Sequence, residues 1–196
     1  PDLAHAYRHP LVWITLHHRA SARPQTKTIM TDTLKLLCCT NGGLGLLPKS
    51  PGTWSSLKPL LAVLILGHFG SPQALTIGLL LLVVVITSII TIKLAPWYTQ
   101  HFGQKDPPQV VSDEAAGQSI ALLGMAWLQP NNHVSPTIWI GLAVASFILF
   151  RVFDIWKPAF IDSSQNLPGG WGVLMDDILA GIIAGILVAI GAVLLV

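Results

Sequence analysis

Charged residues are scarce in this chain. Asp, Glu, Lys and Arg make up 10% of its 196 residues, whereas an ordinary soluble domain has about 25%. Three long stretches contain none of these four residue types: 59–92, 115–150 and 178–196. A helix that crosses a bilayer needs about 20 consecutive, mainly apolar residues. The first two stretches therefore have room for a helical hairpin each and the third for one span, which predicts an integral membrane protein.

Cysteine and basic runs are also nearly absent. The net charge is only +2 and no cluster of Lys and Arg is typical of nucleic-acid binding, so we expect no nucleic-acid partner. The two cysteines, Cys38 and Cys39, are adjacent, and neighbouring cysteines rarely meet disulfide geometry. Neither is followed six residues later by Arg, which excludes a Cys-x5-Arg phosphatase loop. We interpret both as apolar residues near the membrane.

Residues 1–29 differ from the rest of the chain. They carry three Arg, one Lys and four His without a sustained hydrophobic period. We interpret 1–29 as a basic, histidine-containing N-terminal extension that is disordered, and 30–196 as the membrane domain. A metal-binding tail is the alternative, because histidine-rich tracts can bind metal. Met30 is a further candidate for the functional start.

The pattern of apolar runs and turn residues predicts an all-α membrane bundle of about four to five helices. Glycine, serine and proline mark turns at 67–72 and 129–136, and Pro107-Pro108 interrupts a polar connection over 94–112. The expected helices are 57–66, 72–92, one starting at Ser112, 137–153 and 176–196. The first and third are short for full spans, so either is a candidate re-entrant segment.

The distribution of Lys and Arg predicts the orientation. Lysines and arginines lie at 49, 58, 93, 105, 151 and 157, all on one side of this topology, and the opposite turns hold none. The positive-inside rule then places the connection over 93–114 and the stretch over 151–177 in the cytoplasm. Five acidic residues fall at the same ends of different helices: Asp113, Glu114, Asp154, Asp176 and Asp177. We therefore expect a cytoplasm-facing acidic site.

Carboxylates without histidine or cysteine partners favour a hard cation such as Mg²⁺, Mn²⁺ or Ca²⁺ over zinc. Arg151 and Lys157 each lie three residues from Asp154, a spacing that suits either an internal row of ion pairs or a metal-binding acid between two phosphate-binding cations. The glycine-rich loop before Pro51 starts a helix whose backbone N–H groups form a potential anion site. Lys49, Thr53 and Ser55 are candidate additional donors there. These features predict phosphoryl chemistry on a lipid headgroup.

Two other functions fit some of these features. A membrane cation transporter or channel component would use the acidic residues as ion ligands, but it predicts acids at mid-membrane depth rather than at helix ends. A structural membrane subunit would tolerate replacement of Asp154. The G-x-x-x-G pattern at Gly181 and Gly185 allows close helix packing. It suits a homodimer face or, as we prefer, packing inside one subunit.

Four blocks of residues resemble the phosphatidylglycerophosphatase A family of bacterial membrane lipid phosphatases: GLGLLPKSPGTWSSL (43–57), SDEAAG (112–117), FRVFDIWKP (150–158) and GGWGVLMDDILAG (169–181). The resemblance covers about residues 33–196. It implies Mg²⁺-dependent dephosphorylation of phosphatidylglycerophosphate to phosphatidylglycerol at the inner membrane, in phospholipid biosynthesis. The family's acidic positions fall on Asp113, Glu114, Asp154, Asp176 and Asp177 as metal ligands, with Asp113, Glu114, Asp154 and Asp177 as catalytic residues. Its basic positions fall on Arg151 and Lys157, and attack by water and attack by an aspartate both fit.

Overall fold

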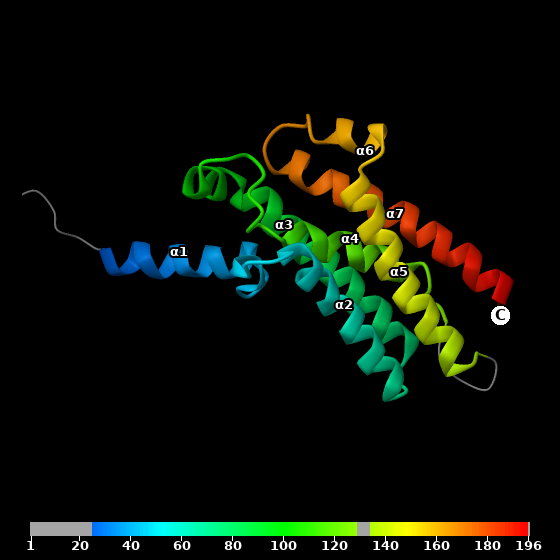
Figure 1. The fold of residues 1–196 in the computed structure, drawn as a ribbon. Helices are drawn as coiled ribbons and strands as arrows, with labels where there is room; N and C mark the ends of the chain where they lie inside the picture. Colours follow the sequence, from blue (N-terminus) through cyan, green and yellow to red (C-terminus); the bar gives the residue numbers. More distant parts are fainter. Residues whose placement is uncertain (1–24, 129–133, 196) are drawn as a thin grey trace, which may run out of the picture. The chain divides into compact units, whose positions relative to one another are not determined.

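The computed structural model describes residues 25–128 and 134–195, and every regular element in these residues is helical (Figure 1). The first 24 residues of the expected extension and part of the expected turn at 129–136 lie outside the described residues. The elements are α1 (Gln25–Cys39), η1 (Leu44–Leu46), α2 (Pro51–His68), α3 (Gln73–Phe102), α4 (Ser112–Leu123), α5 (Pro136–Trp156), α6 (Ala159–Ser164) and α7 (Gly170–Leu195). The described residues divide between Thr33 and Leu34 into two units, and η1 to α7 all belong to the second.

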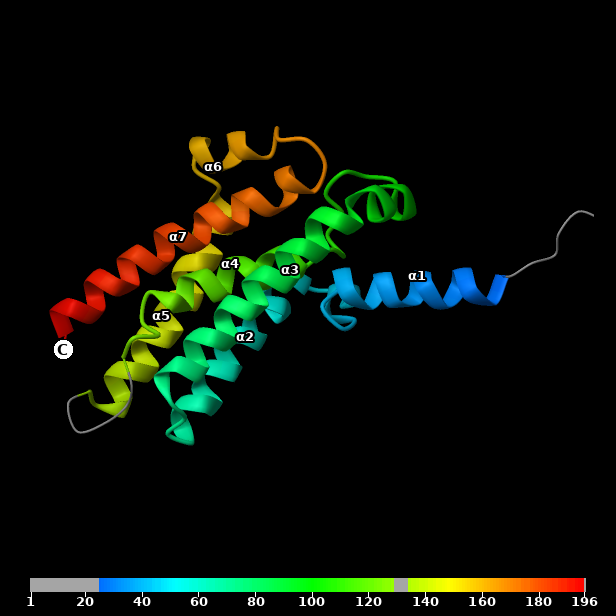
Figure 2. The same cartoon turned by 180° about the vertical axis from the view of Figure 1, so that it is seen from behind.

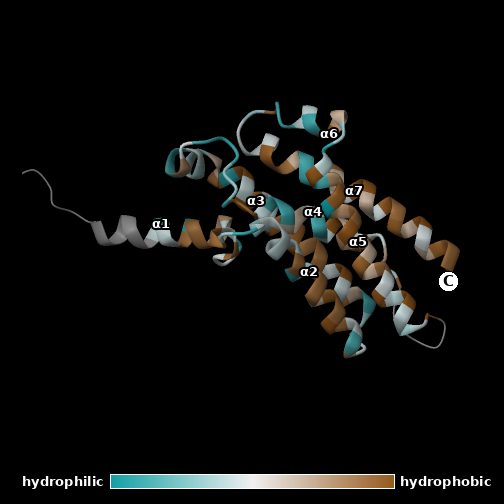
Figure 3. Ribbon diagram, in the orientation of Figure 1, coloured by the Kyte–Doolittle hydropathy of each residue, from teal (hydrophilic) through white to brown (hydrophobic). Residues whose placement is uncertain are grey.

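Three of the described helices, α3, α5 and α7, are long and apolar enough to cross a membrane. Their hydrophobic residues extend along most of each helix, as the brown ribbon in Figure 3 shows. The first half of α2 is polar, and α4 has only 12 residues, or about 18 Å at 1.5 Å per residue. The all-helical membrane bundle is therefore confirmed, and α2 and α4, the first and third of the five predicted helices, fall short of a span.

The short helix α4 lies inside the bundle, surrounded by α2, α3, α5 and α7, as both views show (Figures 1 and 2). Nine of its 12 residues are buried, and most of them are small. Gly117 of α4 lies against the backbone of α7 at Gly181, and Gly124 lies against Gly185. A side chain at Gly117, Gly181 or Gly124 would collide with the facing helix. These glycines therefore allow α4 and α7 to pack backbone to backbone.

This packing bears on the two interpretations of the glycine pattern. Gly181 and Gly185 are both buried, and α4 of the same chain covers them. The pattern therefore serves packing inside one subunit, as we preferred. A homodimer through this face would need a surface that α4 already occupies.

Two helix boundaries differ from the sequence prediction. The helix expected to end at Lys93 continues as α3 through Pro96 to Phe102, where Gly103 ends it in the left-handed conformation. The last helix begins at Gly170 rather than at Asp176. In both cases packing outweighs local propensity, because Gly170 lies against the backbone of α3 at Thr91 and Ile92. Asp176 and Asp177 therefore lie two turns inside α7 instead of at its end.

Candidate metal and phosphate site

Three carboxylates from two helices meet at the centre of the bundle. Asp113 and Glu114 form the first turn of α4, and Asp177 comes from α7. One oxygen from each lies within 4.8 Å of the others. Asp113 and Asp177 are only 5% and 3% exposed. We call these three residues the acid cluster.

The close packing of α4 on α7 builds the acid cluster. Gly117 lies one turn beyond Asp113 on α4, and its Cα faces the backbone oxygen of Asp177 at a distance that excludes any side chain. Gly181 lies one turn beyond Asp177 and contacts Gly117 in return. Residues four apart share a face of a helix. The glycines one turn deeper in the bundle thus set the separation of the carboxylates.

The electrostatics of the acid cluster are unfavourable for the protein alone. Burial raises the pKa of Glu114 to about 7. Burial, and secondly the charge of Glu114, raise the pKa of Asp113 well above its usual range. One oxygen of each cluster carboxylate, namely Asp113 Oδ1, Glu114 Oε2 and Asp177 Oδ1, is buried without a hydrogen-bond partner. Buried acceptors of this kind are costly unless another group compensates them.

A cation would supply that compensation. Three convergent carboxylates offer only oxygen ligands, which is the ligand type that Mg²⁺ and Ca²⁺ prefer. Asp176 Oδ1 is a fourth buried oxygen without a hydrogen-bond partner. The donor set and its unpaired oxygens therefore fit a hard divalent cation.

Arg151 and Asp154 form an ion pair near the end of α5. They are three residues apart, a spacing that places them side by side on a helix. Gly52, at the start of α2, lies against both Glu114 Oε1 and Arg151 Nη1, and a side chain there would displace the Glu114 carboxylate. Arg151 Nε is buried and has no hydrogen-bond partner. The helix start predicted at Pro51 is thus adjacent to the acid cluster and to a guanidinium group with one unused donor.

Lys157 ends α5 in the left-handed conformation, with φ of 45°. Such a conformation costs a non-glycine residue about 1–2 kcal/mol. It accompanies a hydrogen bond of 2.6 Å from Lys157 Nζ to Asp176 Oδ2, and Gln165 Nε2 donates to the same oxygen at 3.2 Å. Burial alone would lower the pKa of Lys157, but the hydrogen bond and the charge of Asp176 raise it overall. Lys157 is therefore a firmly charged ammonium group beside the acid cluster.

Asp154 and Asp176 thus differ from the acid cluster, because each is paired with a cation. The sequence prediction grouped all five acids as metal ligands. The structure brings all five to one region and separates them into three clustered carboxylates and two ion-paired ones.

The residues predicted to support the helix start are placed less favourably. Lys49 is exposed in the loop before α2, and Thr53 is half-buried in the first turn. Ser55 is buried, and both hydrogen bonds of its hydroxyl are internal. It accepts from Asn41 Nδ2 at 2.7 Å and donates to the backbone oxygen of Val111 at 2.5 Å. The substrate-binding role of these three residues stays a prediction. Ser50 precedes α2 as expected, but its side chain makes no capping bond.

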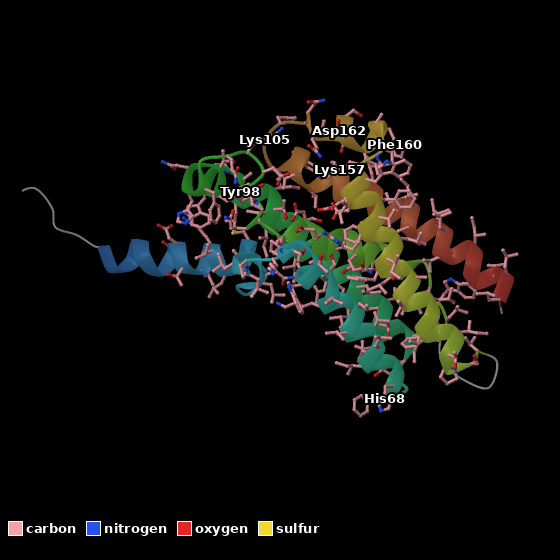
Figure 4. The ribbon with its side chains drawn as sticks, in the orientation of Figure 1. His68, Tyr98, Lys105, Lys157, Phe160 and Asp162 are labelled. Atoms are coloured by element: carbon pink, nitrogen blue, oxygen red, sulfur yellow. The ribbon has the colours of Figure 1, made fainter. Side chains whose placement is uncertain are left out.

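Two residues that shape the site, Lys105 and Gly172, were not predicted from the sequence. Lys105, in the connection between α3 and α4, donates to the backbone oxygens of Gln165 and Leu167 at 2.5 and 2.9 Å. Gly172 leaves room for these same three groups. This contact fixes the loop from which Gln165 reaches Asp176. Figure 4 shows Lys105 and Lys157 on the same side of the bundle as α6, and His68 at the opposite end. Backbone carbonyl partners 60 residues away leave no signal in a sequence.

Comparisons with known proteins agree with this geometry. The profile of the family described as Phosphatidylglycerophosphatase A matches residues 37–192. A protein of Bacteroides thetaiotaomicron named "Putative phosphatidylinositol-3-phosphatase" is 35% identical over 157 residues, covering 80% of this chain and 92% of that protein. Phosphatidylglycerophosphatase A of Escherichia coli is 33% identical over 175 residues, covering 86% of this chain and 92% of the relative. The Haemophilus influenzae protein of the same name is 32% identical over 167 residues, covering 84% and 92%. No solved structure matches the chain.

Proposed function

The chain belongs to the phosphatidylglycerophosphatase A family and is a membrane phosphatase, and we propose that it hydrolyses phosphatidylglycerophosphate to phosphatidylglycerol and phosphate with the aid of Mg²⁺. The reaction takes place at the cytoplasmic face of the bacterial inner membrane, because Lys and Arg gather at the site end of the spanning helices. The observation that carries the proposal is the acid cluster, whose unpaired buried oxygens lie beside Arg151.

Each group near the cluster has a place in this reaction. Asp113, Glu114 and Asp177 would hold the metal ion, and Asp154 and Asp176 orient Arg151 and Lys157. A divalent cation held by these residues would supply Lewis-acid and charge-neutralising chemistry at the phosphoryl group. The Arg151 guanidinium and the Lys157 ammonium then bind the remaining phosphate oxygens, which is favourable because charge-assisted hydrogen bonds to phosphate are strong.

The metal requirement gives the first test. Purified protein in mixed micelles is expected to release inorganic phosphate from phosphatidylglycerophosphate with Mg²⁺ present, to stop after EDTA treatment, and to recover when Mg²⁺ is restored. Phosphatidylinositol 3-phosphate, assayed in parallel, tests the substrate named for the Bacteroides relative. Release that is undiminished by EDTA would contradict the metal role, and no release from either lipid by the wild type would contradict the proposed reaction.

The role of Lys157 gives a second test. Lys157→Asn removes the ammonium group but keeps a residue that tolerates the left-handed conformation. We expect kcat/KM to fall about 10- to 100-fold, the range typical when an outer hydrogen-bond partner in a metal site is lost, because both the phosphate contact and the partner of Asp176 are removed. Lys93→Asn, at an exposed position of α3, is the matched control and should retain wild-type activity. Equal activity of the two variants would exclude a role for Lys157.

A cation transporter is the rival function, and a flux experiment distinguishes it from a phosphatase. Its ions must pass through the bundle, whereas the acid cluster lies toward the end of the bundle where α2 begins and α5 ends, which is the end that we propose faces the cytoplasm. Proteoliposomes containing the protein are expected to show no Mg²⁺ flux above that of empty vesicles under conditions in which phosphate is released. Flux that is lost in Asp177→Asn would support the transporter instead.

A further inference from the structure

A groove of about 270 Å³ lies between α2 and α3. Asn41 and Lys58 line one part of it, and Leu79, Leu82 and Ile86 of α3 line another. Lys58 is the one charged residue among the described residues that line this groove. Leu82 and Ile86 are about half exposed on a candidate membrane span, so the groove opens towards lipid.

The polarity of the groove changes along α2 in a fixed order. Gly52 contacts Glu114 of the acid cluster, and Pro59, two turns further on the same side of α2, lines the groove. Helix residues rise 1.5 Å each, so Lys58, six residues after Gly52, lies about 9 Å from Gly52 along the axis of α2. Ala62, ten residues after Gly52, lies about 15 Å from Gly52 along the same axis. On the antiparallel helix α3, the lining likewise runs from Thr87 at the site end to Leu79 further away.

A phospholipid that carries a terminal phosphate has the same order of groups. Its terminal phosphate monoester is followed by a polar spacer, then by the phosphate diester, then by the acyl chains. With the monoester at the acid cluster, the diester reaches the depth of Lys58, and an acyl chain reaches Ala62 and the leucines of α3. The order of charge and apolar surface thus matches one class of ligand, namely the substrate lipid itself.

Lys58 is suited to a diester phosphate because no carboxylate neutralises it in the described part of the chain. Its Nζ donates to the backbone oxygen of Asn41 at 2.5 Å and to Asn41 Oδ1 at 3.2 Å. Both acceptors are neutral, so the ammonium group keeps its full charge at the mouth of the groove. Asn41 in turn donates to Ser55, which fixes this amide and hence the position of Lys58.

We propose that the groove between α2 and α3 is the lipid subsite of the enzyme, in which Lys58 binds the phosphate diester and the apolar part receives one acyl chain. This inference rests on the proposed function and names the part of the protein that recognises the substrate as a lipid. Ala115 also lines the groove. It directly follows Glu114 of the acid cluster on α4, so the groove lies next to the proposed metal site.

Filling the groove tests the acyl-chain part. Ala62→Trp is expected to lower kcat/KM for long-chain phosphatidylglycerophosphate at least tenfold and to leave the deacylated compound, glycerophosphoglycerophosphate, at the wild-type rate. Ile148→Trp places the same side chain on an exposed position of α5 and should change neither rate. An equal loss on both substrates, or an equal loss in both variants, would overturn the proposal.

Replacing the cation tests the diester part. Lys58→Gln is expected to raise KM about tenfold for both the acylated and the deacylated compound, because both contain the diester. Lys93→Gln, the control, should leave KM unchanged. The two groove variants thus differ in their substrate pattern, which a general loss of stability would not produce. A normal KM for Lys58→Gln on both compounds would remove Lys58 from the subsite.

Photolabelling tests the groove without requiring turnover. Phosphatidylglycerol with a diazirine near the end of one acyl chain is cross-linked to the wild-type protein in vesicles and mapped by mass spectrometry. Labelling of residues 79–86 is expected to decrease with excess unlabelled phosphatidylglycerol and in Ala62→Trp, unlike labelling around Ile148. If neither excess phosphatidylglycerol nor Ala62→Trp reduces the labelling of 79–86, the groove does not bind an acyl chain. Absence of phosphate release by the wild type would instead contradict the proposed function.

Discussion

Asp177→Asn is expected to lower the rate of phosphate release about a thousandfold, which corresponds to ~4 kcal/mol of transition-state stabilisation. Asp177 is the α7 member of the acid cluster, with Oδ1 buried and unpaired. An amide keeps the volume of the side chain but removes one of the three negative charges that would attract a divalent cation. The expected signature is therefore a loss of Mg²⁺ dependence together with the rate, measured by phosphate release over a range of Mg²⁺ concentrations.

Asp162→Asn is the matched control for this variant. Asp162 lies in α6, is exposed, and takes part in no ion pair within the described residues. The same change of charge there should leave both the rate and the Mg²⁺ dependence at wild-type values. Thermal unfolding in detergent shows whether Asp177→Asn stays folded. A folded Asp177→Asn protein with more than a tenth of the wild-type rate would remove Asp177 from the proposed metal site.

The sequence was sufficient to predict the membrane class and the approximate positions of the long helices. Length and apolarity are properties of a continuous stretch, so the charge-free runs identified α3, α5 and α7 directly. Helix ends were predicted less well, because they depend on contacts between distant residues. Pro96 and the glycines at 170 and 172 look like helix breakers, yet α3 continues through Pro96 and α7 begins at Gly170, which packs on Thr91 and Ile92 of α3.

The site likewise has features that could be predicted from the sequence and features that could not. The convergence of the acids could be predicted from topology, because antiparallel helices bring Asp113, Glu114 and Asp154 to one end of the bundle, although Asp176 and Asp177 lie two turns inside α7 rather than at its end. Their separation into the acid cluster and two ion pairs did not follow, because it depends on side-chain direction. Asp176 and Asp177 are neighbours in sequence, yet one pairs with Lys157 and the other faces Asp113 and Glu114. The left-handed conformation of Lys157, which accompanies this pairing, had no signal in the residues around it.

The second large effect is expected from Gly181→Val. Even a single added carbon at Gly181 would collide with the backbone oxygen of Gly117, and backbone cannot move aside without separating α4 from α7. Overpacking of a tight interior costs about 1–3 kcal/mol and occasionally more. We expect the upper part of this range, measured as a lower midpoint of thermal unfolding in detergent, and a loss of activity in the protein that remains folded, because Asp177 moves away from Asp113.

Gly141→Val is the control, since an added carbon at this exposed position of α5 meets no other atom. The comparison also decides between the two interpretations of the glycine pattern. If Gly181 belonged to a dimer face, valine would convert a dimer into a stable and active monomer, which light scattering would reveal as a halved molar mass. Packing within one chain predicts the opposite combination, because the same contact that holds α7 against α4 also sets the distance between the carboxylates. Stability and activity are then lost together at unchanged molar mass.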